Sequence, residues 1–263
     1  MTAIELNAMA TRDFEAKLAQ AKTLLLQAAA QYANPGDFTA LGYSTITQAN
    51  SLGAEDMVVS HLINNLQLDI GIFVLETGML HAETLHLLEQ LKTNSRAPVT
   101  VFKPVSASVV QFVAGEGKEA MYKSIELRKA CCGIRKMEPL ARALAGKKAW
   151  VTGLRREQSG ARADVPLRDE SDVTNGVQRV KFNPLADWTW GDVWHYINLY
   201  QVAYNPLHDQ FFPSIGCAPC TRAISLGEDF RAGRWWWEHE SAKECGLHAK
   251  EAVEPSPKEE AVV

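Results

Sequence analysis

The chain has 263 residues, of which 46% are hydrophobic, and a formal net charge of −4. This length and composition suit one large globular α/β domain. The acidic balance and the lack of a long Lys/Arg block argue against a nucleic-acid-binding protein. Its Ala/Leu-rich N-terminal stretch holds too many polar residues for a signal peptide or membrane span, so we expect a cytoplasmic protein without a membrane partner.

Residues 11–32 are predicted to form a helix, because their large apolar residues recur at helical spacing. The sequence Asn-Pro-Gly-Asp at 34–37 ends it. We therefore treat residues 1–37 as an N-terminal helical segment and assign it no chemistry.

Apolar runs and helical patterns then alternate along the chain. The predicted strands span residues 41–50, 69–75, 99–102 and 149–153, and the predicted helices span 57–66, 81–92, 118–129 and 188–202. This alternation predicts a doubly wound, mostly parallel α/β sheet over residues 38–240, whose ligands bind at the carboxyl ends of the strands. Residues 241–263 follow as a C-terminal tail.

Candidate anion-binding residues follow three of these strands. They are Ser51, Gly53, Glu55 and Asp56 after the first strand, Thr77 and Gly78 after the second, and Arg155 and Arg156 after the fourth. Backbone N–H groups at a helix N-terminus can hold a phosphate, and guanidinium groups bind phosphate or sulfate oxygens in pairs. Their convergence predicts an anionic nucleotide pocket.

Four of the five cysteines form two pairs, Cys131-Cys132 and Cys217-x-x-Cys220. Neighbouring residues of a strand face opposite sides, so the first pair can serve one centre only from a helix or turn. Structural zinc thiolates usually stand two to four residues apart, and a redox disulfide in the second pair leaves the first unexplained. An iron–sulfur cluster tolerates varied spacing and is favoured, but all three sites stay open at this point.

Three consecutive tryptophans, 235–237, follow Arg231 and Arg234. They cannot all face one side of a regular element, so at least one is expected at a cleft or subunit boundary. The two arginines are further candidates for binding an anion. Together with the N-terminal helix, the tryptophans leave room for a homo-oligomer.

The fifth cysteine, Cys245, lies between Lys243 and His248. Nearby positive charge lowers the pKa of a cysteine, so Cys245 is a candidate nucleophile; the alternative is an incidental cysteine near a chain end. The residues after His248 have the composition of a disordered segment. A nucleophile just inside a mobile tail can close onto a bound substrate and later reach a partner.

Four motifs in combination resemble the bacterial assimilatory adenylyl-sulfate reductases of the iron–sulfur type, and the resemblance runs from about Ser51 to His248. The motifs are Cys131-Cys132-Gly-Ile-Arg-Lys136, Gly216-Cys-Ala-Pro-Cys-Thr-Arg222, Gly233-Arg-Trp-Trp-Trp237 and Lys243-Glu-Cys-Gly-Leu-His248. The resemblance implies an adenine nucleotide α-hydrolase-like fold. It also implies one 4Fe–4S cluster on Cys131, Cys132, Cys217 and Cys220, with Lys136 between cluster and substrate.

The reaction that the resemblance implies serves sulfate assimilation and cysteine biosynthesis. Cys245 attacks the sulfur of adenylyl sulfate, AMP leaves, and reduced thioredoxin releases sulfite from the resulting thiosulfonate. Nucleophile and sulfate are both anionic, so attack needs dense positive charge. The candidates to supply it are Lys136, Arg155, Arg156, Arg231, Arg234 and His248. Glu76, Met79 and Leu154 depart from the residues common in the family, which leaves the nucleotide affinity open.

Three other functions are weighed against this one. Relatives that reduce the 3′-phosphorylated nucleotide generally lack the two cysteine pairs, although use of both substrates is conceivable. ATP pyrophosphatases of related fold carry a Ser-Gly-Gly-x-Asp-Ser loop, whereas this chain has Ser-Leu-Gly-Ala-Glu-Asp at 51–56. An iron–sulfur regulator that binds nucleic acid is disfavoured by the acidic charge balance.

Overall fold

The computed structural model describes residues 1–33, 44–174 and 176–238. The strands are β1 (Ile46–Asn50), β2 (Gly71–Leu75), β3 (Val99–Phe102), β4 (Ala149–Val151), β5 (Arg168–Thr174) and β6 (Val177–Phe182). The α-helices are α1 (Ala3–Asn7), α2 (Phe14–Tyr32), α3 (Ala54–Asn65), α4 (Ala82–Asn94), α5 (Ser106–Glu116), α6 (Ile125–Cys132), α7 (Glu138–Ala143) and α8 (Trp190–Tyr200). Among the described residues, none of these helices has the length and hydropathy to cross a membrane.

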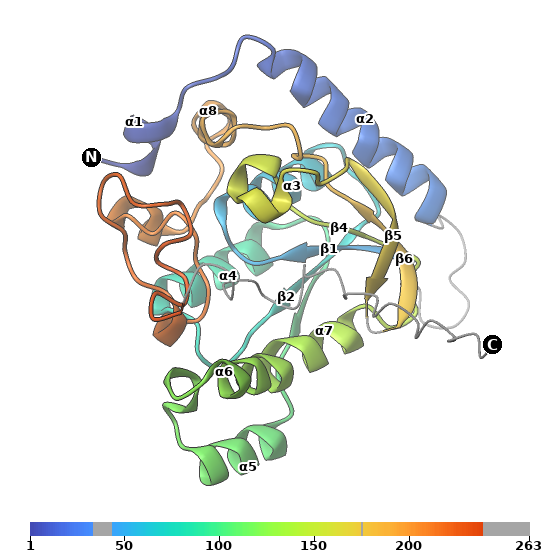
Figure 1. Cartoon of the computed structure of the whole chain (residues 1–263). Helices are drawn as coiled ribbons and strands as arrows, with labels where there is room; N and C mark the ends of the chain where they lie inside the picture. Colours follow the sequence, from blue (N-terminus) through green and yellow to red (C-terminus); the bar gives the residue numbers. More distant parts are fainter. Residues whose placement is uncertain (34–43, 175, 239–263) are drawn as a thin grey trace, which may run out of the picture.

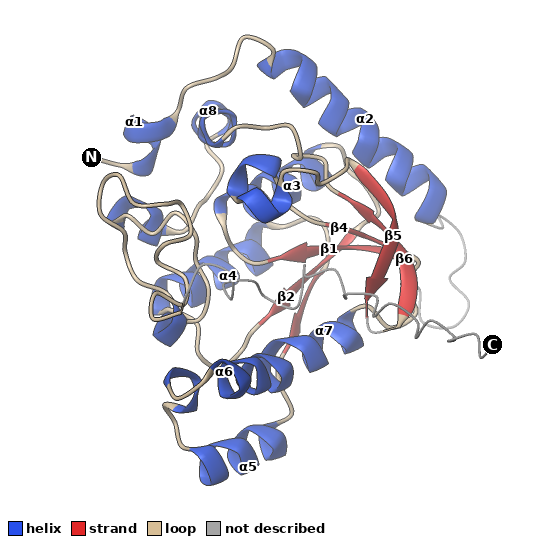
Figure 2. Ribbon diagram, in the orientation of Figure 1, coloured by secondary structure: helices blue, strands red, loops and turns tan. Residues whose placement is uncertain are grey.

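One six-stranded sheet organises the chain, in the order β3-β2-β1-β4-β6-β5 (Figure 2). All neighbouring strands are parallel except β5, which pairs antiparallel with β6 at the edge. The chain moves from β1 out to β3 and then returns to place β4 on the other side of β1. This reversal makes a topological switch point between β1 and β4, where sheets of this class bind their ligands.

Helices cover both faces of the sheet (Figure 1). The larger core joins apolar residues of α2, α3, α4 and α8 to one face of the central strands. The smaller core joins Leu140 and Leu144 to Phe73 of β2 and Trp150 of β4 on the opposite face. Alternate residues of β2 and β4 therefore enter different cores, as expected for strands buried on both faces.

The prediction of a doubly wound, mostly parallel sheet is confirmed, and all four expected strands are present. Strand β1 begins at Ile46; the earlier start expected near residue 41 lies outside the described residues. Strands β5 and β6 were not predicted. In β6 the polar residues Gln178, Arg179 and Lys181 interrupt the apolar ones, and Arg168–Thr174 of β5 is almost entirely polar. Such a composition is tolerated at a sheet edge, where charged side chains discourage pairing with other chains.

The helix expected over 118–129 is shifted toward the C-terminus. A short 3-10 turn occupies 120–122, and α6 begins only at Ile125, because the Ser124 hydroxyl caps it by accepting the Leu127 N–H. The N-terminal segment does not stand apart, since Phe14, Leu18 and Leu25 of α2 belong to the main core. The domain boundaries given for the sequence stay predictions.

Candidate active site

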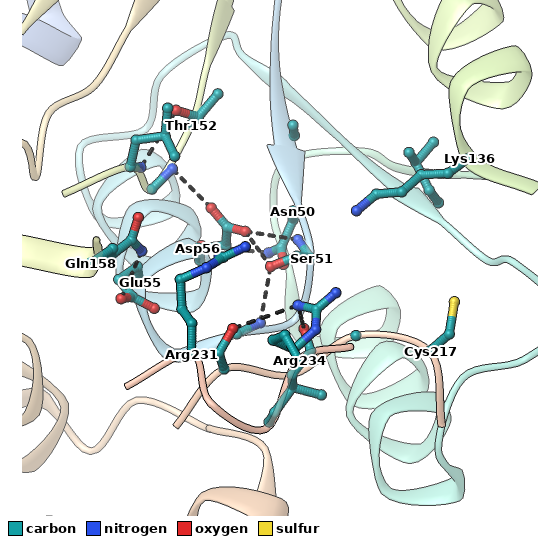
Figure 3. Close-up of a pocket in the computed structure, with 18 of the residues that line it drawn as sticks. Asn50, Ser51, Glu55, Asp56, Lys136, Thr152, Gln158, Cys217, Arg231 and Arg234 are labelled. Atoms are coloured by element: carbon teal, nitrogen blue, oxygen red, sulfur yellow. Dashed lines mark hydrogen bonds between the residues drawn. The ribbon is translucent and has the colours of Figure 1, made fainter. Parts of the chain in front are cut away.

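A cavity of about 200 Å³ lies at the carboxyl ends of β1, β2 and β4, at the switch point of the sheet (Figure 3). Its walls come from the turns after these three strands and from two later loops, around 213–217 and 230–235. The predicted site residues that line it are Ser51, Gly53, Glu55, Asp56, Thr77, Lys136, Arg231, Arg234, Cys132, Cys217 and Cys220. The fold thus brings most of the predicted site residues together around one cavity.

Asp56 ties the turn after β1 to the turn after β4. Its carboxylate accepts hydrogen bonds from the Ser51 N–H (2.8 Å) and hydroxyl (2.6 Å) and from the Gly153 N–H (2.9 Å). These hydrogen bonds act to lower the pKa of Asp56, but burial, with a further contribution from the charge of Glu55, outweighs them and raises it. Asp56 therefore holds two strand ends together, and a ligand meets a cavity wall whose shape is already fixed.

Glu55 is held in a second polar network on the same wall. It accepts hydrogen bonds from Arg155 (3.0 Å) and Gln158 (2.9 Å), and Gln158 in turn accepts one from Arg162 (2.6 Å). Burial acts to raise the pKa of Glu55, but the charge of Arg155 and the Gln158 hydrogen bond outweigh it, so the pKa lies below its usual value. Glu55 is consequently an ionised, paired carboxylate.

The two arginines after β4 do not line the cavity, contrary to their expected place as an anion clamp. The Arg155 side chain is 1% exposed and forms ion pairs with Glu55 and Glu157. Arg156 pairs with Asp187 and donates to the Val165 carbonyl. A guanidinium already paired with carboxylates offers little free charge to a ligand, so the structure assigns Arg155 to supporting the cavity wall.

Three of the predicted cationic residues do line the cavity. Arg231 and Arg234 enter from one loop, and Lys136 reaches in from the wall that carries Cys217 (Figure 3). Arg234 packs so closely on Gly216 that a Cβ there would lie 2.4 Å from the guanidinium, and it stacks on the Trp235 ring at 4.7 Å. This fixes one charge in place, which favours electrostatic stabilisation of an anion.

Two further residues of the cavity wall were missed by the sequence reasoning. Arg162 lies in a 3-10 turn at 160–162 with no strand end before it, and His208 lies in another at 206–210. Burial lowers the pKa of His208 to about 4, against the charge of Glu55, so the imidazole is neutral near pH 7. Arg162 and His208 reach the cavity only through tertiary packing, so no local sequence pattern predicts their place.

The four paired cysteines surround one smaller cavity beside the first. Cys131 and Cys132 end helix α6, as their adjacency required, and the π-helical turn over 133–137 that follows carries Lys136, which lines both cavities. The Cys217 sulfur lies 3.2 Å from the Thr77 hydroxyl, which connects the second pair to the end of β2. Both pairs therefore meet, although 85 residues separate Cys132 from Cys217.

Four cysteine thiols on one cavity are a donor set that suits a zinc or iron–sulfur centre. Burial, and next the charges of Cys217, Cys132 and Cys131, raise the pKa of the Cys220 thiol to about 12. Thiolates that repel one another in this way need a cationic centre to ionise together. Among the described residues, no three Cys, His, Asp or Glu side chains are arranged to hold a single metal ion. Cys245 and His248 lie outside the described residues.

Comparison with solved structures defines the class of this fold. The chain is similar to phosphoadenylyl-sulfate (PAPS) reductase from Candida auris in a phosphate complex, with a TM-score of 0.62, 22% identity, and coverage of 78% of this chain and 90% of that chain. It is also similar to Candida glabrata FMN adenylyltransferase, with a TM-score of 0.55, 12% identity, and coverage of 92% and 83%. The chain therefore has an adenine nucleotide α-hydrolase-like fold.

Residues 45–223 match the phosphoadenosine phosphosulfate reductase domain. A protein of Allochromatium vinosum named adenosine 5′-phosphosulfate reductase is 51% identical over 213 residues, which cover 81% of this chain and 82% of that one. A protein of the same name from Burkholderia cepacia is 54% identical over 200 residues, covering 76% and 79%. The chain belongs to the phosphoadenosine phosphosulfate reductase family and is a reductase acting on sulfur.

Proposed function

We propose that this protein reduces adenylyl sulfate (adenosine 5′-phosphosulfate) to sulfite and AMP. The observation that carries the proposal is the position of Lys136, Arg231 and Arg234 on a switch-point cavity bordered by the paired cysteines. Relatives at 51% and 54% identity bear the name of this activity. The alternative substrate is the 3′-phosphorylated nucleotide, which the names of these relatives do not favour.

In this proposal the turns after β1, β2 and β4 bind the nucleotide. Ser51, Gly53, Thr77 and Gly78 contribute to this part of the site, and Glu55 and Asp56 support it from within the wall. Gly78 lies beside the lining rather than in it; its φ of 73° lets the chain turn after Thr77. Lys136, Arg231 and Arg234 bind the phosphosulfate and offset the charge that develops during attack.

The chemistry requires a nucleophile, and we assign it to Cys245, with His248 as a nearby positive group. The Cys245 thiolate forms a bond to the sulfate sulfur while the sulfur–oxygen bond to the AMP phosphate breaks. One thiol of reduced thioredoxin then attacks the Cys245 sulfur and expels sulfite. Its second thiol displaces Cys245, so thioredoxin leaves as a disulfide and supplies the two electrons.

We further propose that Cys131, Cys132, Cys217 and Cys220 hold one 4Fe–4S cluster. A cluster bound there would help to arrange the charged site. The convergence of both cysteine pairs on one cavity supports this assignment, as does their mutual repulsion without a cation. A cytoplasmic location and a homo-oligomeric assembly complete the proposal. The first rests on the polar residues of the N-terminal stretch, and the second on the tryptophan run and the N-terminal helix.

The test is anaerobic incubation with adenylyl sulfate and no reductant, followed by intact mass measurement and peptide mapping. We expect a sulfite-sized addition on Cys245 that reduced thioredoxin removes. Cys245→Ser should abolish the adduct and sulfite release while AMP binding and the colour of the cluster persist. An adduct from the 3′-phosphorylated nucleotide alone would reassign the substrate, and no adduct from either nucleotide would refute the mechanism.

A further inference from the structure

Arg128 and Glu238 form a buried ion pair that the proposed reaction does not use. Arg128 Nε donates to Glu238 Oε1 at 2.7 Å and Nη2 donates to Oε2 at 2.9 Å, so both ends of the fork are engaged. The two side chains are 2% and 3% exposed. A paired, parallel arrangement of this kind fixes orientation as well as distance.

Each partner of this pair belongs to a segment with a proposed role. Arg128 lies on α6, four residues before Cys132, and interacts with the Cys132 thiol. Its guanidinium stacks on the Trp235 ring at 4.7 Å, and Trp235 lines the cavity. Glu238 comes three residues after Trp235 and ends the described part of the chain. The pair therefore joins the cysteine-bearing helix to the start of the C-terminal segment.

The sequence places Cys245 seven residues beyond Glu238. Seven residues span at most about 25 Å when fully extended, so the point at which Glu238 is held limits where Cys245 can go. If Glu238 were displaced from α6, the positions that Cys245 can reach would be displaced with it. A nucleophile must lie within bond-forming distance of its target, and displacement by about 1 Å can cost about 100-fold in rate.

We propose that the Arg128–Glu238 ion pair is an anchor that fixes the origin of the Cys245-bearing segment against the cysteine helix. Arg128 and Glu238 are thus positioning residues that act through Cys245. This inference rests on the proposed function for its consequence in catalysis, whereas the anchor itself is a property of the described residues. It predicts that breaking the pair slows attack on bound substrate without weakening nucleotide binding, because neither residue lines the nucleotide cavity.

The test uses Glu238→Gln in the full-length, cluster-loaded protein. The amide keeps the size of the side chain but cannot form the charged fork with Arg128. We expect the rate of adduct formation on Cys245 at saturating adenylyl sulfate to fall about tenfold or more. The dissociation constant for AMP should stay within about twofold. Hydrogen exchange of residues 233–238 should become faster, which reports on the anchor without any turnover.

The chain offers a matched control in Arg142 and Glu138. Their fork has the same pairing of atoms, with Nε to Oε1 at 2.6 Å and Nη2 to Oε2 at 3.0 Å, but their side chains are 43% and 41% exposed and lie on α7. Glu138→Gln should change none of the three readouts. The double variant Arg128→Met/Glu238→Met removes both buried charges together, so it keeps the test available if the single variant folds poorly. Because Arg128 also lines the cysteine cavity, this variant is compared with wild type at equal cluster content.

The outcomes separate the two proposals. A wild-type rate of adduct formation in Glu238→Gln, or an equal loss of AMP affinity, would overturn the anchor while leaving the proposed function intact. If wild-type protein forms no adduct, the proposed function fails. Hydrogen exchange then decides the anchor alone: unchanged protection of residues 233–238 in the variant would refute it, and lost protection would support it.

Discussion

Arg155 and Arg156 are neighbours in the chain but have different surroundings, and their substitution should have different effects. Arg155 is buried beneath the cavity wall, where it neutralises Glu55. Breaking a buried pair by removing one partner leaves an uncompensated charge, which costs about 3–5 kcal/mol. We expect Arg155→Met to lower the free energy of unfolding by this amount, measured by anaerobic denaturant titration.

Arg156→Met is the control for that experiment. The Arg156 side chain is 40% exposed and its partner Asp187 is 30% exposed, so solvent screens their interaction. Exposed pairs contribute about 0–1 kcal/mol, and we expect a change in that range. Equal losses of stability in the two variants, or a large loss of AMP affinity in Arg156→Met alone, would restore the sequence-based view of this pair as an anion clamp.

At the scale of elements, the turns after β1 and β4 meet with almost no space between them. A Cβ on Gly153 would lie 2.6 Å from Asp56 Oδ1 and 2.9 Å from the Glu55 Cβ. Forcing atoms into such a contact typically costs about 1–3 kcal/mol. Gly153→Ala should therefore destabilise the protein by about that amount and weaken AMP binding, because both displaced residues belong to the cavity wall.

The comparison for Gly153→Ala is Gly160→Ala, seven residues later. No atom lies within 4 Å of the position that a Cβ would occupy on Gly160. Thermal unfolding and AMP titration of the two variants should differ clearly, with Gly160→Ala close to wild type. If Gly153→Ala matched it in both measurements, the two turns would have enough freedom to separate, and Asp56 would not fix the wall.

The strands and helices that were predicted correctly are those with a strong local pattern of apolar residues. Strands β2 and β3 follow continuous apolar runs, and α2 and α8 show clear helical spacing, so all four were predicted close to their observed bounds. Helix α5 was missed, although its half-buried residues Val109, Phe112 and Val113 recur at helical spacing. None of its residues is fully buried, and the exposed Val110 beside them blurs the one-sided apolar pattern. Strand β5 was missed because its edge position permits a polar sequence.

At the scale of the whole molecule, the sequence predicted which segments converge but not how their side chains pair. The carboxyl ends of parallel strands share one edge of the sheet, so Ser51, Thr77 and the end of β4 could be placed together there. Whether an arginine there faces a ligand or a buried carboxylate depends on side-chain packing across 100 residues, as between Glu55 and Arg155. That pairing has no signature in either segment alone.

The stability of the whole molecule should depend on pH through His208. Burial lowers its pKa to about 4 in the folded protein, whereas an unfolded chain has a histidine pKa of about 6.5. Between these values the unfolded state binds a proton that the folded state does not. The contribution of His208 to the free energy of unfolding is therefore highest above pH 6.5 and falls as the pH drops toward 4, by up to about 1.4 kcal/mol per pH unit.

His208→Gln isolates this contribution, because glutamine does not titrate while other groups, including Asp56, titrate in both proteins. We expect the stability of the variant relative to wild type to increase by about 2 kcal/mol between pH 7 and pH 5, since 1.5 pH units of the window are crossed. Between pH 7 and pH 8 the difference should stay constant, because the imidazole is then neutral in both states. The measurement is anaerobic denaturant titration of both proteins from pH 8 to pH 5. Parallel curves of stability against pH would mean that His208 gains its proton as readily in the folded protein as in the unfolded chain. The burial of His208 against the cavity would then have to be abandoned.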